Sequence, residues 1–374
     1  MATNNNNKAL NVPPLRFPEF SGEWNKCTIN DLATVVGGGT PDTTVKSYWG
    51  GDIQWFTPSE IGKNKYVDFS LRTITRDGLD NSSAKLLPLH TILLSSRATV
   101  GECSIASNEC TTNQGFQSLI AKQCNIDFLY YLIQTKKKDL IRNACGSTFL
   151  EISANEIRKI KVAVPVQNEQ EQIAKLLSLI DERIATQNKI IEKLQSLIKG
   201  LAAQLTQSGT PNIRLCDCLE CHSSTLQENC VSVTGSYPVY GATGLIGYTN
   251  NYAYNGESIL IVKDGSGVGS LSYVNDHFSV IGTLNYLTAK ENYSILYLYY
   301  ALMAFNFTPY ITGMAIPHIY FKDYGKAKLF YPSIEKRIRI ASLLHNIEQK
   351  LVVEQNLVIS LSAQKSYLLR MLFI

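Results

Sequence analysis

The densest group of potential metal ligands is the run CDCLECH at residues 216–222, which combines three cysteines with one histidine. Zinc sites usually take their ligands as two separated pairs, and no second pair is present. The alternation of Leu215, Asp217 and Leu219 predicts a strand, which would place Cys216 and Cys218 together on the opposite face. We therefore interpret these cysteines as packed thiols and expect no metal ligands in this chain.

Two glycine-rich runs could in principle hold a phosphate. The run DGSGVG at residues 264–269 is followed by SLSYVNDHFSV, which is typical of a strand, whereas a phosphate loop leads into a helix. The run VVGGGTP at residues 35–41 is likewise more typical of a turn. The sequence has no P-loop, no zinc-protease motif, no Asn-Pro-Pro-Tyr motif of amino-methyltransferases and no GxSxG. We therefore expect no catalytic residues in this chain.

The remaining candidates for chemistry are cations, amides and tyrosines that suit a nucleic acid. Lysine and arginine neutralise phosphates, while arginine, asparagine and glutamine bind base edges in the major groove. The sequence predicts DNA-binding residues at Lys63, Lys65, Arg72, Arg76, Arg97, Gln114, Tyr240, Asn250, Asn251 and Lys263.

Each of these candidates has a plain structural alternative. About half of the tyrosines in YPVYGATGLIGYTNNYAYNGE, residues 237–257, are accounted for by ordinary strand packing. Arg97 in SSRATVG and Lys263 in IVKDGSG occupy nearly matched places, and each either approaches DNA or braces a loop.

Length and composition set the frame for these residues. A chain of 374 residues is too long for one core and predicts two domains. Its 45% hydrophobic and 18% charged content is typical of a folded soluble protein, and its net charge of +4 permits an acidic partner. No apolar run reaches the ~20 residues that cross a bilayer, the N-terminus lacks a signal peptide, and the odd number of cysteines favours reduced thiols. We expect a cytoplasmic protein.

Two stretches carry the same helical pattern. The stretch from Pro165 to Leu205 and the stretch from Pro332 to Leu372 are offset by 167 residues, and apolar residues recur in both at alternating steps of three and four. In each stretch one position of the apolar pattern is polar: Gln187 in the first and its copy Glu354 in the second. Lys365 is the other polar exception. The predicted interface consists of Ile173, Leu177, Ile180, Ile184, Ile191, Leu194, Ile340, Leu344, Ile347, Leu351, Val358 and Leu361.

A helix with one apolar stripe must bury it, and the copy is the nearest partner. We therefore predict an antiparallel intramolecular coiled coil of two helices, each about 60 Å long.

The repeat extends beyond the helices. Ile152 pairs with Ile319 at the same offset, Gly101 pairs with Gly269 at 168, and FLYYL at 128–132 pairs with ILYLYY at 295–300 at 167. Upstream, INDL near Leu32 corresponds to LCDCL near Leu219, so the first copy contains an extra segment.

The chain is therefore predicted to be an α/β (α+β) protein with pseudo-twofold symmetry. It contains a flexible tail at 1–14, a first globular head at 15–165, a central helix at 166–206, a second globular head at 207–331 and a distal helix at 332–374.

The order of these motifs resembles the specificity subunit of type I restriction–modification systems. The resemblance is carried by LRFPEFSGEW at 15–24, the Gly-Thr-Pro to Trp-x-Thr-Pro segment at 37–61, TTNQGFQSL at 111–119, YPVYGATGLIGY at 237–248 and VPVQNEQEQIAKLLSLID at 164–181. The second helix departs from the pattern, since Arg337 stands for Gln170 and Glu348 for Asp181.

The resemblance implies that the heads at 15–165 and 207–331 are target-recognition domains. It implies a non-catalytic subunit that reads a bipartite, asymmetric DNA target with one half-site per head. It implies that the helices set the spacer and dock two modification methyltransferase subunits, with restriction and translocase subunits joining them. S-adenosylmethionine would then belong to the modification subunits, and ATP and magnesium to the restriction subunits. One alternative is a bivalent scaffold that binds another protein and not DNA. The others are an enzyme whose active site lies in the heads, and a related fragment used in another context.

Overall fold

The structure, a computed structural model, describes residues 11–146 and 150–374. The chain divides into two compact units, of which unit 1 contains Met1–Thr186 with Val358–Ile374 and unit 2 contains Gln187–Leu357. Most of the predicted tail, residues 1–10, lies outside the described residues. Asn11 is already tied to its unit, because its backbone oxygen and side-chain amide both bond to the backbone of Trp24.

Unit 1 is built on three small sheets with the strand orders β2-β9-β6-β7-β4, β5-β3-β8 and β1-β10. The first sheet contains β2 (Ala33–Gly37), β4 (Tyr66–Val67), β6 (Ile92–Leu94), β7 (Cys103–Ala106) and β9 (Gln117–Ala121). The others contain β3 (Trp49–Phe56), β5 (Arg72–Ile74), β8 (Cys110–Thr112), β1 (Asn25–Thr28) and β10 (Lys161–Val164). The β-branched and aliphatic runs TILLSS and KIKVAVP contain β6 and β10.

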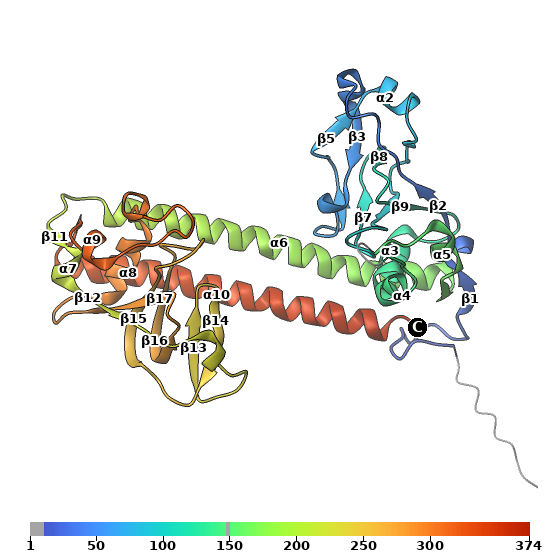
Figure 1. Cartoon of the computed structure of the whole chain (residues 1–374). Helices are drawn as coiled ribbons and strands as arrows, with labels where there is room; N and C mark the ends of the chain where they lie inside the picture. Colours follow the sequence, from blue (N-terminus) through green and yellow to red (C-terminus); the bar gives the residue numbers. More distant parts are fainter. Residues whose placement is uncertain (1–10, 147–149) are drawn as a thin grey trace, which may run out of the picture. The chain divides into compact units, whose positions relative to one another are not determined.

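Short helices complete unit 1: α1 (Ile29–Leu32), α2 (Arg76–Asp80), α3 (Ile126–Thr135), α4 (Lys137–Arg142) and α5 (Ala154–Lys159). Figure 1 shows β3, β5 and α2 at the end of this unit away from the long helix α6.

Unit 2 has a six-stranded sheet with the order β12-β17-β15-β16-β13-β14 and a β11-β18 pair. Its strands are β11 (Ile213–Arg214), β12 (Leu219–Ser223), β13 (Tyr237–Gly241), β14 (Gly244–Thr249), β15 (Tyr254–Val262), β16 (Leu271–Val280), β17 (Leu284–Ala289) and β18 (Lys328–Leu329). Its short helices are α7 (Leu215–Cys218), α8 (Ile295–Met303) and α9 (Phe321–Tyr324). The strand expected after DGSGVG is confirmed as β16, so those glycines form the β15–β16 turn.

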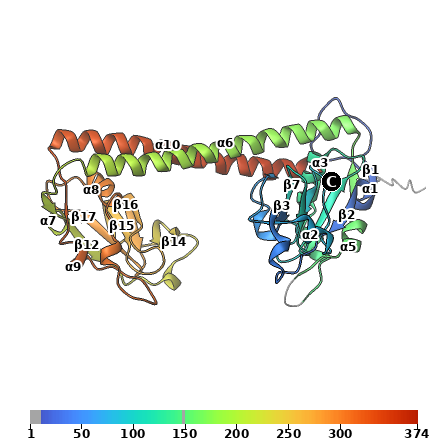
Figure 2. The same cartoon turned by 90° about the horizontal axis from the view of Figure 1, so that it is seen from above.

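The two predicted long helices are α6 (Gln167–Thr206) and α10 (Ile334–Met371). The views in Figures 1 and 2 agree in placing them side by side. Within unit 1, Lys365 forms a 2.7 Å ion pair with Asp181, and within unit 2, Gln187 bonds to Glu354. From Asp181 to Gln187 the residue number rises along α6, while that of the bonded residue on α10 falls from Lys365 to Glu354. The two helices therefore pair in antiparallel directions, as predicted. All twelve predicted interface residues are buried or half-buried.

Each end of the helix pair is part of the core of its own unit. In unit 1, Ile173 and Leu177 of α6 and the C-terminal Phe373 pack with Trp24 and Phe128. In unit 2, Ala202 of α6 and Leu344 of α10 pack with residues of the other core. The helices are therefore inseparable from the cores that they join, and their seam is stabilised by apolar burial at both ends.

Hydrogen bonds confirm that the two heads repeat the same backbone. Ile152 donates its N–H to the carbonyl of Ser96, and Ile319 donates to the carbonyl of Lys263, so both partners are offset by 167. The N–H of Ser96 in turn donates to the carbonyl of Gly115, and the N–H of Lys263 donates to the carbonyl of Thr283. Gly115 and Thr283 are offset by 168 residues, as predicted for this part of the repeat.

The upstream repeat is also confirmed. The N–H of Lys122 donates to the carbonyl of Leu32, and the N–H of Lys290 donates to the carbonyl of Cys218. Leu32 therefore corresponds to Cys218, at an offset of 186 residues. The predicted extra segment of the first copy therefore lies between Leu32 and Ser96.

One predicted alignment and one predicted strand are wrong. The side chain of Asn125 caps α3 at Phe128 and that of Ser294 caps α8 at Tyr297, so these helices match at an offset of 169 and not 167. Residues Leu215–Cys218 form the helical turn α7, so Cys216 and Cys218 do not alternate along a strand. Leu215 and Cys218, three residues apart, are instead buried together.

Candidate nucleic-acid interface

An arginine is stacked on a tryptophan at the end of unit 1 away from α6. The Cζ atom of Arg72, at the start of β5, lies 3.6 Å from the ring centroid of Trp49 on β3. The ring of Trp49 is fixed edge-to-face against Trp55, and its Nε1–H donates to the carbonyl of Asp42. Stacking on a held aromatic ring orients the plane of the guanidinium and leaves its N–H edge free.

The backbone that leads into Arg72 is fixed by side chains of its neighbours. The hydroxyl of Ser70 donates to the carbonyl of Arg72, and the N–H of Ser70 donates to Oε1 of Gln54. The N–H of Leu71 donates to the carboxylate of Glu60 at 2.7 Å. Even so, Phe69 is 81% exposed and Leu71 is 88% exposed. Segment 69–72 is therefore an ordered loop that displays two large apolar side chains and one arginine.

The other predicted cations of the first head are bonded to carboxylates, with one exception. Arg76 pairs with Asp80 at 3.2 Å, and Arg97 pairs with Glu151 at 2.6 Å. Both pairs lie near the surface, where an ion pair contributes little to stability but occupies the donors. Lys63 is exposed.

Lys65 is occupied inside unit 1. Its ammonium lies 2.7 Å from the carboxylate of Asp127 and 2.6 Å from the hydroxyl of Ser178 on α6, and it faces the ring of Tyr131. The side chain is only 9% exposed. Its position indicates a brace between the head and α6.

Gln114 lies on the surface of the first head beside the glycine-rich turn. Its Oε1 accepts a bond from the hydroxyl of Thr40, which leaves its amide nitrogen as a donor. A Cβ atom on Gly38 would lie 2.0 Å from the carbonyl of Asn113, so only glycine permits this approach of the turn. The predicted turn in VVGGGTP thus brings Thr40 to Gln114.

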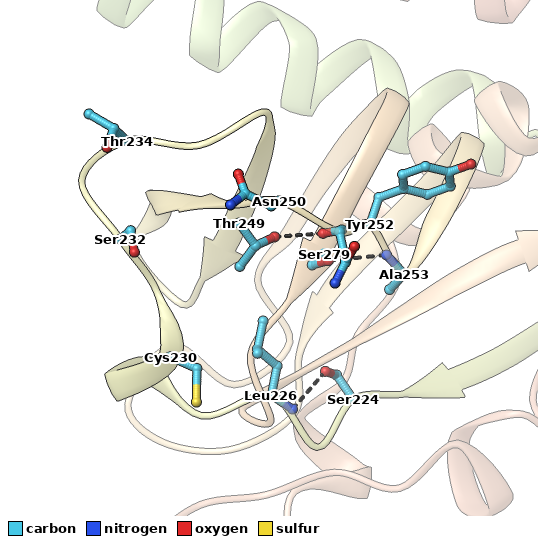
Figure 3. A pocket seen from close by; sticks show the side chains of 11 residues that line it. Ser224, Leu226, Cys230, Ser232, Thr234, Thr249, Asn250, Tyr252, Ala253 and Ser279 are labelled. Carbon is cyan, nitrogen blue, oxygen red and sulfur yellow. Dashed lines mark hydrogen bonds between the residues drawn. The ribbon is translucent and has the colours of Figure 1, made fainter.

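In the second head, Asn250 and Asn251 lie on the exposed turn after β14 and line a cavity of about 470 Å³ (Figure 3). The turn is ordered by the hydroxyl of Thr249, which donates to the carbonyl of Asn251 at 2.6 Å. Hydroxyls of Ser232, Thr234 and Ser279 contribute to the same lining. The lining is polar and apolar in about equal parts, and its polar groups offer both donors and acceptors.

Tyr240 and Lys263 are less available than the two asparagines. Tyr240 is half-buried on β13 against Phe278, and burial raises the pKa of its hydroxyl. The Lys263 ammonium is 3.9 Å from the carboxylate of Asp264. The backbone match of Ser96 with Lys263 makes Asp264 the counterpart of Arg97, so Arg97 and Lys263 are neighbours in the repeat and not equivalents.

Three aromatic rings form a cluster beside the turn that follows β14, and none of the three residues was among the predicted site residues. The centroid of Tyr252 lies 4.9 Å from that of Tyr237 and 4.5 Å from that of His277. Tyr237 and Tyr252 belong to a tyrosine-rich run that is visible in the sequence. The approach of His277 depends on the pairing of β15 with β16, and no local sequence pattern indicates it.

No group of three or more cysteine, histidine or acidic side chains that could hold a metal ion occurs among the described residues. Within residues 11–146 and 150–374, no helix is long and apolar enough to cross a membrane. The buried thiols Cys103, Cys110, Cys124 and Cys218 each have a pKa raised to about 12 by burial, which keeps them protonated and unreactive.

Comparison with known proteins identifies the family. The sequence profile described as "Type I restriction modification DNA specificity domain" matches residues 21–196 and 213–361. The chain belongs to this family. It is a specificity subunit, the non-catalytic component of a type I restriction–modification system.

Two relatives show the range of similarity. The MjaIX specificity subunit of Methanocaldococcus jannaschii is 39% identical over 183 residues, which cover 46% of this chain and 42% of the relative. The EcoprrI specificity subunit of Escherichia coli is 25% identical over 361 residues and is covered to 87%, as is this chain.

The fold is shared with solved specificity subunits. The crystal structure of the S subunit from M. genitalium superposes with a TM-score of 0.66 at 19% identity and covers 97% of this chain and 99% of that one. A chain from a study of type I system assembly superposes with a TM-score of 0.54 at 14% identity, covering 92% of this chain and 96% of that one.

In this specificity subunit, sequence reasoning found the cations but not the residues that decide their availability. The stacking partner Trp49 lies on β3, and Phe69 and Leu71 follow an ordinary mixed pattern that also fits buried positions. Exposure of an apolar residue is set by which strands cover it, and no local pattern encodes that.

Proposed function

We propose that this specificity subunit reads a bipartite, asymmetric DNA target, with one half-site bound by each head. The observation that carries the proposal is a shared backbone with unlike surfaces. Ile152 and Ile319 anchor the same turn in the two heads, yet Arg97 of the first is matched by Asp264 of the second. The Trp49–Arg72 stack lies between Leu32 and Ser96, the region in which the first head is longer than the second. Unlike surfaces on one framework fit two different half-sites, whereas a homodimer fits a palindrome.

We propose that the helix pair sets the spacer between the half-sites. Forty residues of α6 correspond to a rod of about 60 Å, which exceeds one turn of DNA, ~34 Å. The seam is antiparallel and buried, and a polar pair interrupts it where the two copies meet at Gln187 and Glu354. Such a pair fixes the register of two helices, which a ruler requires.

The outer faces of the helices are proposed to dock two modification methyltransferase subunits. On α10, Ile338, Val352 and Ile359 are exposed, and their spacing in multiples of seven places them on one face. On α6, Ile190 and Leu197 are exposed seven residues apart. Exposed apolar rows of this kind, outside the seam between the helices, are typical of a partner surface.

In this account the chemistry belongs to the partners. The modification subunits bind S-adenosylmethionine, and restriction subunits that join the complex use ATP and magnesium. The weak net charge of +4 fits a subunit whose partners supply part of the phosphate contact, and access to cellular DNA places the complex in the cytoplasm.

A gel-shift experiment tests the proposal. The chain is combined with its modification subunit and mixed duplexes at low salt, and each component is also tested alone. We expect a shifted complex that requires this chain and weakens steeply with salt. No shift at low salt would favour the alternative of a bivalent scaffold for another protein.

A further inference from the structure

We propose that Arg72 reads a guanine in the half-site of the first head and that Trp49 positions it; this inference rests on the proposed DNA-binding function. Two observations carry it: the guanidinium is held in one plane, and its donors are not taken by a carboxylate. The stack on Trp49, at 3.6 Å, fixes the plane. Among the residues that the structure describes, no ion pair joins Arg72 to an acidic side chain.

The contrast with the other cations of this head decides the choice. Arg76 and Arg97 are bonded to Asp80 and Glu151, and Lys65 is enclosed against Asp127. Lys63 is exposed, but within residues 11–146 and 150–374 its ammonium faces no aromatic ring, and it carries a point charge, which suits a phosphate. Recognition of a base needs an arginine that is both oriented and free, because O6 and N7 of guanine accept two parallel N–H bonds in one plane.

The surroundings of Arg72 fit a base-contacting loop. The segment is anchored by Gln54, Glu60 and Ser70, so little conformational freedom is lost on binding. Phe69 and Leu71 stay in solvent on this ordered backbone. Apolar side chains of this kind make contact with the thymine methyl group in the major groove, so the loop offers one guanidinium edge and two apolar surfaces.

Figure 1 also places β3 and β5 at the end of the unit away from α6. Because the first head is longer than the second in the region that holds this stack, we expect the contact to be specific to one half-site.

The test measures binding of the complex with its modification subunit to the target duplex and to duplexes in which each guanine of the half-sites is replaced in turn. For the wild type, we expect replacement of one guanine of the first half-site to weaken binding on the order of tenfold or more. For Arg72→Ala, the penalty at that guanine disappears while penalties at other positions persist. Arg142→Ala, at an exposed arginine of α4 that pairs with Asp139, is the matched control and keeps the wild-type pattern.

Further variants separate recognition from folding. Arg72→Lys keeps the charge but not the planar fork, and it should lose the same preference with an unchanged melting temperature. Trp49→Ala should reduce the preference, while Trp49→Phe, which keeps a ring under the guanidinium, should retain it. An equal loss of affinity for every duplex in Arg72→Ala indicates a phosphate contact and overturns the inference, as does an unchanged pattern. Wild-type binding with no sequence preference overturns the proposed function itself.

Discussion

The side chain of Gln187 donates a hydrogen bond from Nε2 to Oε2 of Glu354, the residue that occupies the same place 167 positions later in the repeat. A residue that bonds to its own copy marks the point where the two antiparallel helices mirror one another. Gln187 is 1% exposed, and the side chain of Glu354 is 13% exposed and also pairs with Lys350. The one skipped beat in each heptad pattern is therefore a matched polar pair in an apolar seam.

Replacing Gln187 with leucine should destabilise the chain by about 1–3 kcal/mol, because the buried Glu354 carboxylate then loses its amide donor. The double variant Gln187→Leu with Glu354→Leu should recover that stability, since two apolar groups complete the seam. Thermal unfolding followed by circular dichroism measures both. A single variant that is as stable as the double variant would show that the pair makes no energetic contribution.

Arg16 should prove essential to the first head. Its guanidinium forms two bonds of 2.8 and 2.7 Å to the carboxylate of Glu169, which is fully buried at the start of α6 and also accepts from Trp24 Nε1. Arg16→Ala should cost about 3–5 kcal/mol because a buried charge is left unpaired. Arg183→Ala, an exposed arginine of the same helix, serves as the control. The result that contradicts this account is an equal melting temperature for the two variants.

Stability should fall as the pH rises above about 9. The thiols of Cys103, Cys110, Cys124 and Cys218 have a pKa raised from 9.0 to about 12 by burial. A raised pKa in the folded state means that the unfolded thiol ionises first, so each group lowers stability by up to about 1.4 kcal/mol per pH unit between those values. Denaturant unfolding at pH 7 to 10 measures the slope.

A matched pair of variants checks the cause of that slope. Cys110→Ala should reduce the alkaline slope, while Cys230→Ser, at an exposed site, should leave it unchanged. Equal slopes in all three proteins would rule out the buried thiol as a contributor.

Removing one heptad from both helices should shorten the spacer of the target. Deletion of residues 184–190 together with their copies 351–357 keeps the antiparallel seam in phase, whereas deletion of 184–190 alone shifts one end against the other. Seven residues correspond to about 10 Å of helix, so we expect a gap shorter by about three base pairs or a loss of methylation. An intact target with its original gap would show that the helices do not measure the spacer.

The sequence predicted the elements whose signals are local or repeated. The heptad steps, the skipped beat at Gln187 and the offset of Gly101 from Gly269 all follow from periodicity, and each has a counterpart in the structure. The alignment of α3 with α8 failed by two residues because aromatic residues recur there at several spacings, and only the caps at Asn125 and Ser294 distinguish them. The strand predicted at Leu215–Cys218 is wrong because a pattern of four residues is too short to distinguish a helical turn from a strand.

The candidate site was less predictable because availability is a tertiary property. Arg72 and Arg97 are equivalent in type, but Glu151 reaches Arg97 through a bridge formed 54 residues later in the chain, while Trp49 reaches Arg72 through the β3–β5 pairing. Which arginine is bonded to a carboxylate and which is stacked cannot be read from composition or spacing. The DNA contacts of the individual residues stay predictions.

Methylation profiling of DNA from cells that carry this chain with its modification subunit tests the central claim most directly. The account predicts an asymmetric motif in two parts separated by a fixed gap of unspecified bases, and its disappearance when this chain is deleted. A single uninterrupted motif, a palindrome, or methylation that persists without this chain would contradict it.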